Sequence, residues 1–337
     1  MDAPLRHDLP SRRRRPMLAA GALGVAALLA ACGGTDDGAG DDGSTDGSPV
    51  VLATTSIWAD VTSNVACGEL DVATLIPAGT DAHEFEPSVQ QADELRDADL
   101  VVANGLGLEE GLLDSLAAAG DDGVRVLEVG PELDPIEGGH DHGHDEEHAD
   151  DEHADEDLAE GELDPHVWMD PDRVAAAVPL IATALEGLDA LPVDGDELQA
   201  CAEEYTAELE ALSAEMDEQL SSLPDERRRL VTNHEALGYL DDRFDVEVIG
   251  TVIPSTSSLG EASVRDLDEL AAEMQEQGVT RIFGEVTGSD DVADALAQRV
   301  GDDVEVVALF TESLGEDGSG ANSYVEMMRS NAVLITG

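Results

Sequence analysis

The chain has 337 residues, of which 77 are acidic and only 16 are basic, and no lysine occurs among the basic residues. A surface this acidic argues against nucleic acid or an anionic lipid surface as a partner. Because acidic residues cover the whole chain, we interpret the charge as adaptation to a salty medium or a coding bias rather than as a device for cation capture.

The first 32 residues have the pattern of a lipoprotein signal peptide. Arginines at 12–15 precede an apolar run at 17–30, and small residues lead directly to Cys32. A run of this length is too short to cross a bilayer, so a transmembrane anchor is disfavoured. We therefore expect cleavage before Cys32, a lipid on its thiol, and an extracytoplasmic protein anchored to the cell membrane. The paired arginines also allow twin-arginine export, so the export route stays open.

Residues 33–49 are nearly all Gly, Asp, Thr and Ser, a composition that predicts a flexible acidic tether. From residue 50 onward, short apolar runs alternate with helix-like stretches in two successive halves. Buried strands are predicted at residues 50–55, 72–76, 100–103 and 124–129, and again at 230–232, 246–253, 281–283 and 304–310. Helices are predicted at residues 87–97, 108–119, 263–277 and 290–299. This alternation predicts an α/β fold with two doubly wound parallel-sheet lobes, residues 50–195 and 224–337.

Residues 196–223, between the two halves, form a long amphipathic run with apolar residues at helical spacing, and the run ends at Pro224. A single helix of this length, about 40 Å at the standard rise, could join the lobes as a rigid spine. The alternative is an ordinary packed helix inside one domain.

Two cysteines remain after Cys32, namely Cys67 and Cys201. In an exported protein, two otherwise unused cysteines favour a disulfide over a pair of free thiols. Neither has a nearby His or Cys that would suggest a metal site.

Once the signal peptide is set aside, three histidines stand alone, each in a loop-like segment. His83 comes after the strand predicted at 72–76, His166 lies between two prolines, and His234 follows the strand at 230–232. Glu312 follows the last predicted strand. Parallel α/β sheets collect ligand groups at such strand ends. Three imidazoles and one carboxylate, at about 2.0–2.2 Å, would complete a tetrahedron around Zn²⁺.

Other carboxylates compete for the fourth position. Glu84, Glu86, Glu235 and Glu285 all lie close to a strand end or to a histidine, and Glu285 is the runner-up to Glu312. A catalytic zinc usually keeps one position open for water, whereas four protein ligands leave none. The complete set therefore favours metal capture over catalysis.

Five further histidines crowd an acidic insert, residues 138–160, whose stretch from 138 to 157 carries no apolar anchors. They are His140, His142, His144, His148 and His153. We expect this loop to be a secondary metal-binding segment that raises the local zinc concentration or senses supply. The alternative is a solvated surface loop that binds zinc only incidentally.

Four segments, together with Asn322-Ser323-Tyr324 near the end, resemble the solute-binding lipoproteins of zinc and manganese ABC transporters. These segments are residues 79–88, 164–171, 233–239 and 310–314. The resemblance runs in order from about residue 50 to residue 332. It implies two α/β lobes joined by one rigid helix, with the metal in the cleft between them and bound by His83, His166, His234 and Glu312. It also implies a membrane permease and its ATPase as partners, and we expect a monomer.

The sequence departs from the family pattern at two positions. Ala82 replaces a common proline before the first histidine, and Glu312 stands where Asp is frequent. Both carboxylates bind zinc, so the second difference concerns geometry and affinity.

Zn²⁺ is favoured over Mn²⁺ as the cargo. A histidine at the third ligand position, His234, resembles the zinc pattern of the family, whereas a carboxylate there resembles the manganese pattern. Nitrogen-rich shells also suit zinc better than manganese. Zinc-specific members carry a similar histidine-rich acidic loop.

The sequence thus predicts the zinc-capturing component of an ABC importer and not an enzyme. The alternatives are a manganese-binding homologue, a zinc-storage or adhesin lipoprotein, and a zinc hydrolase with Glu84 or Glu285 as general base. No His-Glu-x-x-His motif supports the hydrolase.

Overall fold

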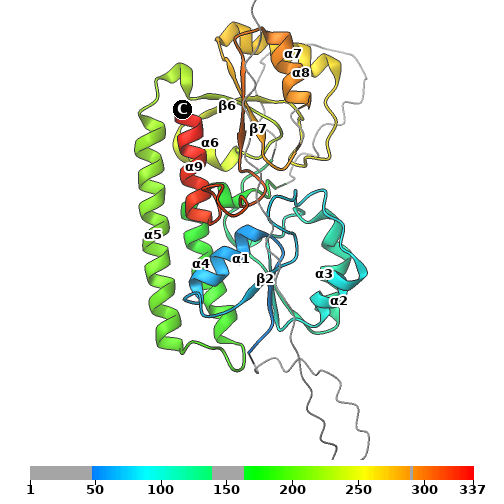
Figure 1. The fold of residues 1–337 in the computed structure, drawn as a ribbon, viewed down its shortest axis with the longest axis vertical. Coiled ribbons are helices and arrows are strands. Elements are labelled where there is room, and N and C mark those ends of the chain that lie inside the picture. Colours follow the sequence, from blue (N-terminus) through cyan, green and yellow to red (C-terminus); the bar gives the residue numbers. More distant parts are fainter. Residues whose placement is uncertain (1–47, 139–162, 289–290) are drawn as a thin grey trace, which may run out of the picture. The chain divides into compact units, whose positions relative to one another are not determined.

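Two four-stranded parallel sheets organise the computed structural model, which describes residues 48–138, 163–288 and 291–337 (Figure 1). The signal peptide with Cys32, nearly all of the tether and most of the histidine-rich insert lie outside the described residues. The two sheets belong to one compact unit that runs to the C-terminus.

The first sheet has the strand order β2-β1-β3-β4. Its strands are β1 (Val51–Ala53), β2 (Val72–Thr74), β3 (Leu100–Ala103) and β4 (Arg125–Glu128), and every pair is parallel. The central strands β1 and β3 are buried along their whole length, as continuous apolar runs covered by helices on both faces require.

The second sheet repeats this order as β6-β5-β7-β8. Its strands are β5 (Arg229–Thr232), β6 (Glu247–Thr251), β7 (Arg281–Glu285) and β8 (Glu305–Leu309), again all parallel. The predicted fold class, with two parallel-sheet α/β lobes, is confirmed. In both lobes the carboxyl ends of the strands lead into the loops that carry the candidate ligands.

The helices of the first lobe include two that the sequence analysis did not assign, α1 (Ser56–Val65) and α4 (Pro171–Glu186). α2 (Val89–Arg96) begins at a capping box made by Ser88. The helix predicted at 108–119 is instead a short 3₁₀ turn, η1 (Glu110–Leu112), followed by α3 (Leu113–Asp121). The turn before it contains left-handed backbone at Gly105, Leu106 and Gly107, which ends any continuous helix there.

The second lobe contains α6 (Gly238–Phe244), α7 (Val264–Gln277), α8 (Asp291–Val300) and the C-terminal α9 (Tyr324–Thr336). α7 and α8 pack together and share a small core with residues of β5, β6 and β7, including Val231, Ile249 and Ile282. Of the helices in the described residues, none has the length and apolar character needed to cross a membrane.

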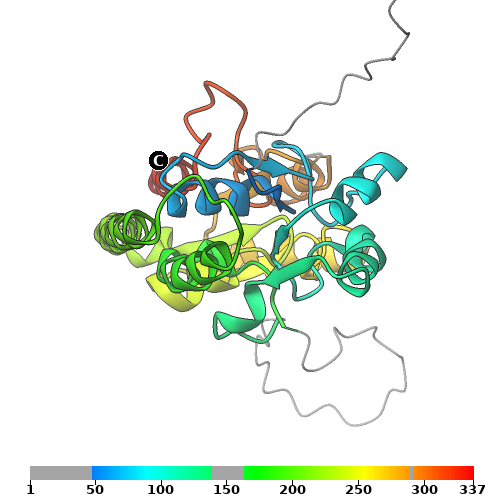
Figure 2. The ribbon, with the colours of Figure 1, turned by 90° about the horizontal axis from the view of Figure 1, so that it is seen from below.

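The long helix predicted at 196–223 is α5 (Gly195–Ser221). It packs against α1 and α4 of the first lobe and against α6 and α9 of the second. Figure 2 shows α5 at the edge of the molecule, beside α4 and the C-terminal helix. Its buried residues recur at helical spacing, from Leu198 to Leu220, so one continuous face contacts both lobes.

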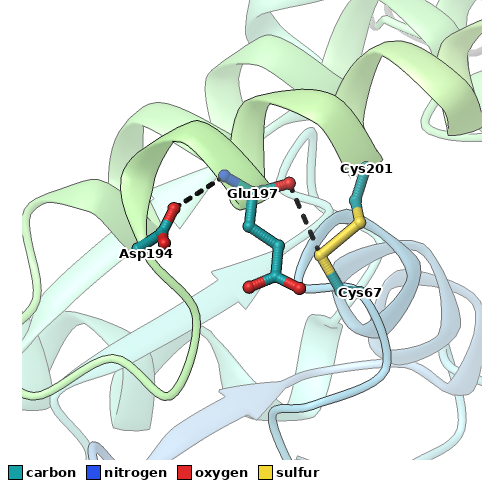
Figure 3. The surroundings of a disulfide bond; sticks show 4 residues. All are labelled: Cys67, Asp194, Glu197 and Cys201. Carbon is teal, nitrogen blue, oxygen red and sulfur yellow. Dashed lines mark hydrogen bonds between the residues drawn. A yellow bond between two sulfur atoms is a disulfide. The ribbon is translucent and has the colours of Figure 1, made fainter.

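A disulfide between Cys67 and Cys201 fastens the first lobe to α5 (Figure 3). The two Cα atoms lie 5.5 Å apart, within the usual range for a disulfide. Cys67 follows α1 in a left-handed conformation, and its Sγ lies 3.6 Å from the carbonyl oxygen of Glu197. Asp194 caps the first turn of α5 by accepting a hydrogen bond from the backbone N–H of Glu197. The predicted pairing is therefore the one that the structure contains.

Candidate metal centre

His83 lies at the end of a tight turn that follows β2. The turn includes Gly79, whose φ of 77° favours glycine, and the N–H of Gly79 donates to Ser313 Oγ of the second lobe at 2.8 Å. Asp81 Oδ1 accepts from the N–H of His83 at 2.9 Å. The imidazole is buried, and the turn directs it toward the loops of the opposite sheet.

His166 belongs to a loop between β4 and α4 and is held by its neighbours. Asp164 Oδ1 accepts from the His166 N–H at 2.9 Å and lies 2.7 Å from Nδ1 of the same residue. Trp168 packs its ring against the imidazole and donates from Nε1 to the carbonyl of Thr311 in the second lobe at 2.8 Å. The loop thus orients His166 and also fixes the segment that carries Glu312.

His234 and Glu285 come from neighbouring strands of the second sheet. β5 ends two residues before His234, β7 ends at Glu285, and the two strands pair at Thr232 and Phe283. Nδ1 of His234 forms a short contact with Oε1 of Glu285. Glu285, the runner-up fourth ligand, therefore lies on the side of the His234 ring that faces away from the other two histidines.

Glu312 follows β8 and is almost completely buried. Neither carboxylate oxygen has a hydrogen-bond partner among the described residues. The loop is tied to the first lobe, since Ser56 Oγ lies 3.1 Å from Ser313 Oγ and accepts from the N–H of Leu314. A buried carboxylate without a hydrogen bond is costly unless positive charge lies against it.

The structure brings together His83, His166, His234 and Glu312. One ligand atom of each lies within 4.8 Å of all the others. Nε2 of His166 is 3.5 Å from Nε2 of His83 and 3.1 Å from Nε2 of His234. The Glu312 oxygens lie 3.8, 3.4 and 3.5 Å from Nε2 of His83, His166 and His234. A tetrahedron of ligands at 2.0–2.1 Å from zinc has edges of about 3.3 Å, so the spacing fits such an ion.

The electrostatics of the cluster follow from burial and from the close approach of opposite charges. Burial alone would raise the pKa of Glu312, but the facing imidazoles lower it to about 2. Burial opposes a charge on His166, yet Glu312 and Asp164 together raise its pKa to about 10. Burial lowers the pKa of His83 to about 4. The cluster thus keeps an ionised carboxylate and holds protons that a metal cation would displace.

The other carboxylates considered from the sequence do not join this set. Glu84 and Glu86 are exposed and Glu235 is half-buried, and within the described ranges the four-residue set above includes none of them. His140, His142, His144, His148 and His153 lie outside the described residues.

A buried network behind His166 escaped the sequence analysis. Asn104, directly after β3, donates from Nδ2 to the carbonyl of Pro165 at 2.9 Å and accepts from Trp58 Nε1 at 2.9 Å. Glu109 accepts from the backbone N–H groups of Asn104 and Gly105 at 2.7 and 3.1 Å. The sequence did contain a signal for this network. Two glycines and an acidic residue follow the buried strand, a pattern typical of a loop with a defined backbone conformation.

Tyr239 holds the same loop from the second lobe. Its hydroxyl donates to the carbonyl of Asp164 at 2.6 Å and accepts from the N–H of Ile136 at 3.2 Å. Arg173 stacks over the ring at 4.7 Å from its centre. The position of His166 therefore depends on residues from both lobes.

Two parallel-sheet lobes that bring three histidines and a glutamate together in one buried cluster fit a metal-binding substrate-binding protein of an ABC transporter. A family model described as "Zinc-uptake complex component A periplasmic" matches residues 51–336, and the chain belongs to this family.

Named relatives differ in the metal that they bind. The chain is 29% identical over 309 residues to the manganese-binding lipoprotein MntA of Halalkalibacterium halodurans, covering 91% of this chain and 93% of the relative. It is 31% identical over 294 residues to the zinc-binding protein TroA of Treponema pallidum, covering 86% and 88%. The solved structure of TroA superposes with a TM-score of 0.73 at 30% identity, covering 86% of this chain and 98% of TroA.

Proposed function

We propose that this protein captures Zn²⁺ outside the cytoplasm and delivers it to the membrane permease and ATPase of an ABC importer. The observation that carries the proposal is the convergence of three imidazole Nε2 atoms and one buried carboxylate, with ligand separations of 3.1–3.8 Å. Four protein ligands complete a tetrahedral zinc shell. Such a shell holds an ion as cargo and leaves no position for a catalytic water.

Zinc is proposed over manganese because of the donor atoms. Three nitrogens and one oxygen suit zinc, whereas manganese prefers carboxylate, carbonyl and water oxygens. His234 supports this choice, since Glu285, the nearest carboxylate to it, contacts its Nδ1 and leaves Nε2 facing the cluster. The relatives named for zinc and for manganese have similar sequence identity to this chain, so the proposal rests on the donor atoms.

The proposed location is the outer face of the cell membrane, with a lipid on Cys32 and the folded part on the tether of residues 33–49. Several similar proteins are named lipoproteins, which supports this placement. We also propose that residues 50–195 and 224–337 act as two lobes joined by a rigid helix, and that the histidine-rich segment 138–160 binds zinc weakly.

Competitive titration of zinc and manganese tests the proposal on the mature chain. Three proteins are compared: the native chain, His234→Ala, and a chain lacking residues 139–162. We expect one tight zinc site in the native and shortened chains, preferred over manganese and destroyed by His234→Ala. If the deletion abolished tight binding while His234→Ala left it intact, storage by the loop would replace transport. Preference for manganese would instead make Mn²⁺ the cargo.

A further inference from the structure

Each of the three histidines has a different carboxylate facing its Nδ1. His166 pairs with Asp164 at 2.7 Å, and His234 contacts Glu285. For His83 the facing group is Glu110, whose Oε1 lies 3.5 Å from Nδ1. A histidine that binds metal through Nε2 carries its proton on Nδ1, and that proton is normally given to an acceptor that fixes the ring. Nδ1 of His83 is buried and makes no hydrogen bond among the described residues, and Glu110 Oε1 is the carboxylate oxygen that faces it.

Glu110 differs from the other two carboxylates in its exposure and in its second contact. Its side chain is 42% exposed, whereas those of Asp164 and Glu285 are 4% and 1% exposed. The same Oε1 accepts a hydrogen bond of 2.6 Å from Ser257 Oγ, which belongs to the second lobe. One oxygen at the edge of the metal site thus faces a ligand of the first lobe and binds a residue of the second.

The backbone around Glu110 is built to hold it against the His83 turn. A Cβ on Gly111 would lie 2.3 Å from the carbonyl oxygen of Phe85, so only glycine allows η1 to approach the turn this closely. The preceding residue, Glu109, is anchored by Thr54 Oγ1, which donates to it at 2.6 Å, and by two backbone N–H groups.

Ser257 lies in a compact turn of the second lobe that is attached beside His234. The N–H of Glu235, the residue after His234, donates to the carbonyl of Ser255 at 2.9 Å. The N–H of Ser257 donates to Ser255 Oγ at 3.0 Å, and Ser257 Oγ accepts from the N–H of Leu259 at 3.3 Å. Movement of Ser257 is therefore linked through a few hydrogen bonds to a second ligand loop.

We propose that Glu110 is a positioning residue that orients His83 and, through Ser257, holds the two lobes together at the exposed edge of the metal site. The proposal rests on the proposed metal-binding function. It makes His83 the ligand that detaches first when the metal leaves. Of the three carboxylates that face the ligand histidines, only the one beside His83 is exposed to solvent. Breaking the Glu110–Ser257 hydrogen bond then frees both a ligand and an inter-lobe contact in one step.

The test measures the rate at which a chelator removes zinc from the mature chain. Glu110→Ala should release zinc at least about tenfold faster, in line with the loss of a partner that orients a ligand. Ser257→Ala should also release zinc faster than the native chain. The double variant should release it no faster than Glu110→Ala, because the two residues act through one contact. Glu110→Gln should recover most of the native rate, since its amide oxygen can accept the hydrogen bond from Ser257 and can face His83 Nδ1 in the same way.

Asp114→Asn is the matched control. Asp114 is an exposed acid in the first turn of α3, four residues from Glu110, and its loss should leave the zinc release rate unchanged. If Glu110→Gln released zinc as fast as Glu110→Ala, Glu110 would act by charge alone and the positioning role would be wrong.

Native release rates in Glu110→Ala or in Ser257→Ala would also overturn the proposal, while leaving the zinc function intact. Failure of the native chain to bind zinc would instead reject the proposed function, and the positioning role with it. An independent readout is the Nδ1–H resonance of His83 in the zinc-loaded protein. It should shift in Glu110→Gln while the corresponding resonances of His166 and His234 stay in place.

Discussion

Oε1 of Glu312 lies 3.4 Å from Nε2 of His166, although Glu312 follows the last strand of the second sheet and His166 belongs to the first lobe. Their contact requires both lobes to keep their positions. Trp168 and Tyr324 enforce this, since Trp168 donates to Thr311 and Tyr324 donates from its hydroxyl to the carbonyl of Trp168 at 2.7 Å. The ligand set is therefore held ready by the packing of the two lobes, which limits the rearrangement needed to bind a metal.

The first prediction separates Glu312 from Glu285. Glu312→Gln should lower zinc affinity more than about 100-fold, because the amide removes the charge that faces three imidazoles. Glu285→Gln should lower it by only about 10–100-fold, as expected for a residue that orients a ligand. Isothermal titration of both variants measures the difference. A larger loss in Glu285→Gln would make Glu285 the fourth ligand after all.

The second prediction concerns metal choice at His234. Replacing this nitrogen by oxygen in His234→Asp should reduce the preference for zinc over manganese, because manganese favours oxygen ligands. The new carboxylate would lie near Glu285, whose charge would repel it. Adding Glu285→Gln should therefore improve manganese binding further. Competitive titration of the single and double variants is the measurement, and an unchanged metal preference would show that donor type at this position does not decide selectivity.

The sequence was sufficient to predict both the fold class and the candidate ligands, because both follow from the positions of the buried strands. Short Val- and Leu-rich runs mark buried parallel strands, and the ends of such strands place His83, His234 and Glu312 near a common edge. His166 lies instead in a loop before α4, where its two flanking prolines and nearby Trp168 made it stand out.

The roles of the outer carboxylates could not be predicted, because they depend on contacts between distant parts of the chain. Glu285 is 51 residues from His234, and Glu110 is 147 residues from Ser257. Asn104 reaches Pro165 across 61 residues. Local patterns do not encode which strand end meets which loop. α4 was missed for a different reason: Pro179 interrupts its pattern, and the helix is stabilised by burial of Val174, Val178 and Ile181 rather than by propensity.

The third prediction is a continuous decline of zinc affinity as the pH falls. Glu312 and Asp164 raise the pKa of His166 to about 10, so this ring holds a proton at neutral pH before zinc binds. Zinc must displace that proton, and Glu285 also raises the pKa of His234, so affinity should fall at least about tenfold per pH unit even between pH 8 and pH 7. His83, whose pKa is lowered by burial to about 4, adds no further loss until the pH approaches that value. Titrations from pH 8 to pH 5.5 would contradict this if affinity stayed flat.

The fourth prediction concerns the disulfide, which closes a loop of 134 residues between the end of α1 and the start of α5. Closing a long loop restricts the unfolded chain, so Cys67→Ser with Cys201→Ser should lower the free energy of unfolding by about 2–5 kcal/mol. The bond joins the first lobe to α5, neither cysteine belongs to the four-residue ligand set, and α5 also packs against α4. Zinc affinity should therefore change little. Denaturant unfolding with and without zinc measures both quantities. A large loss of affinity in the folded variant would show that the disulfide, and not packing alone, keeps α5 in the position that the metal site requires.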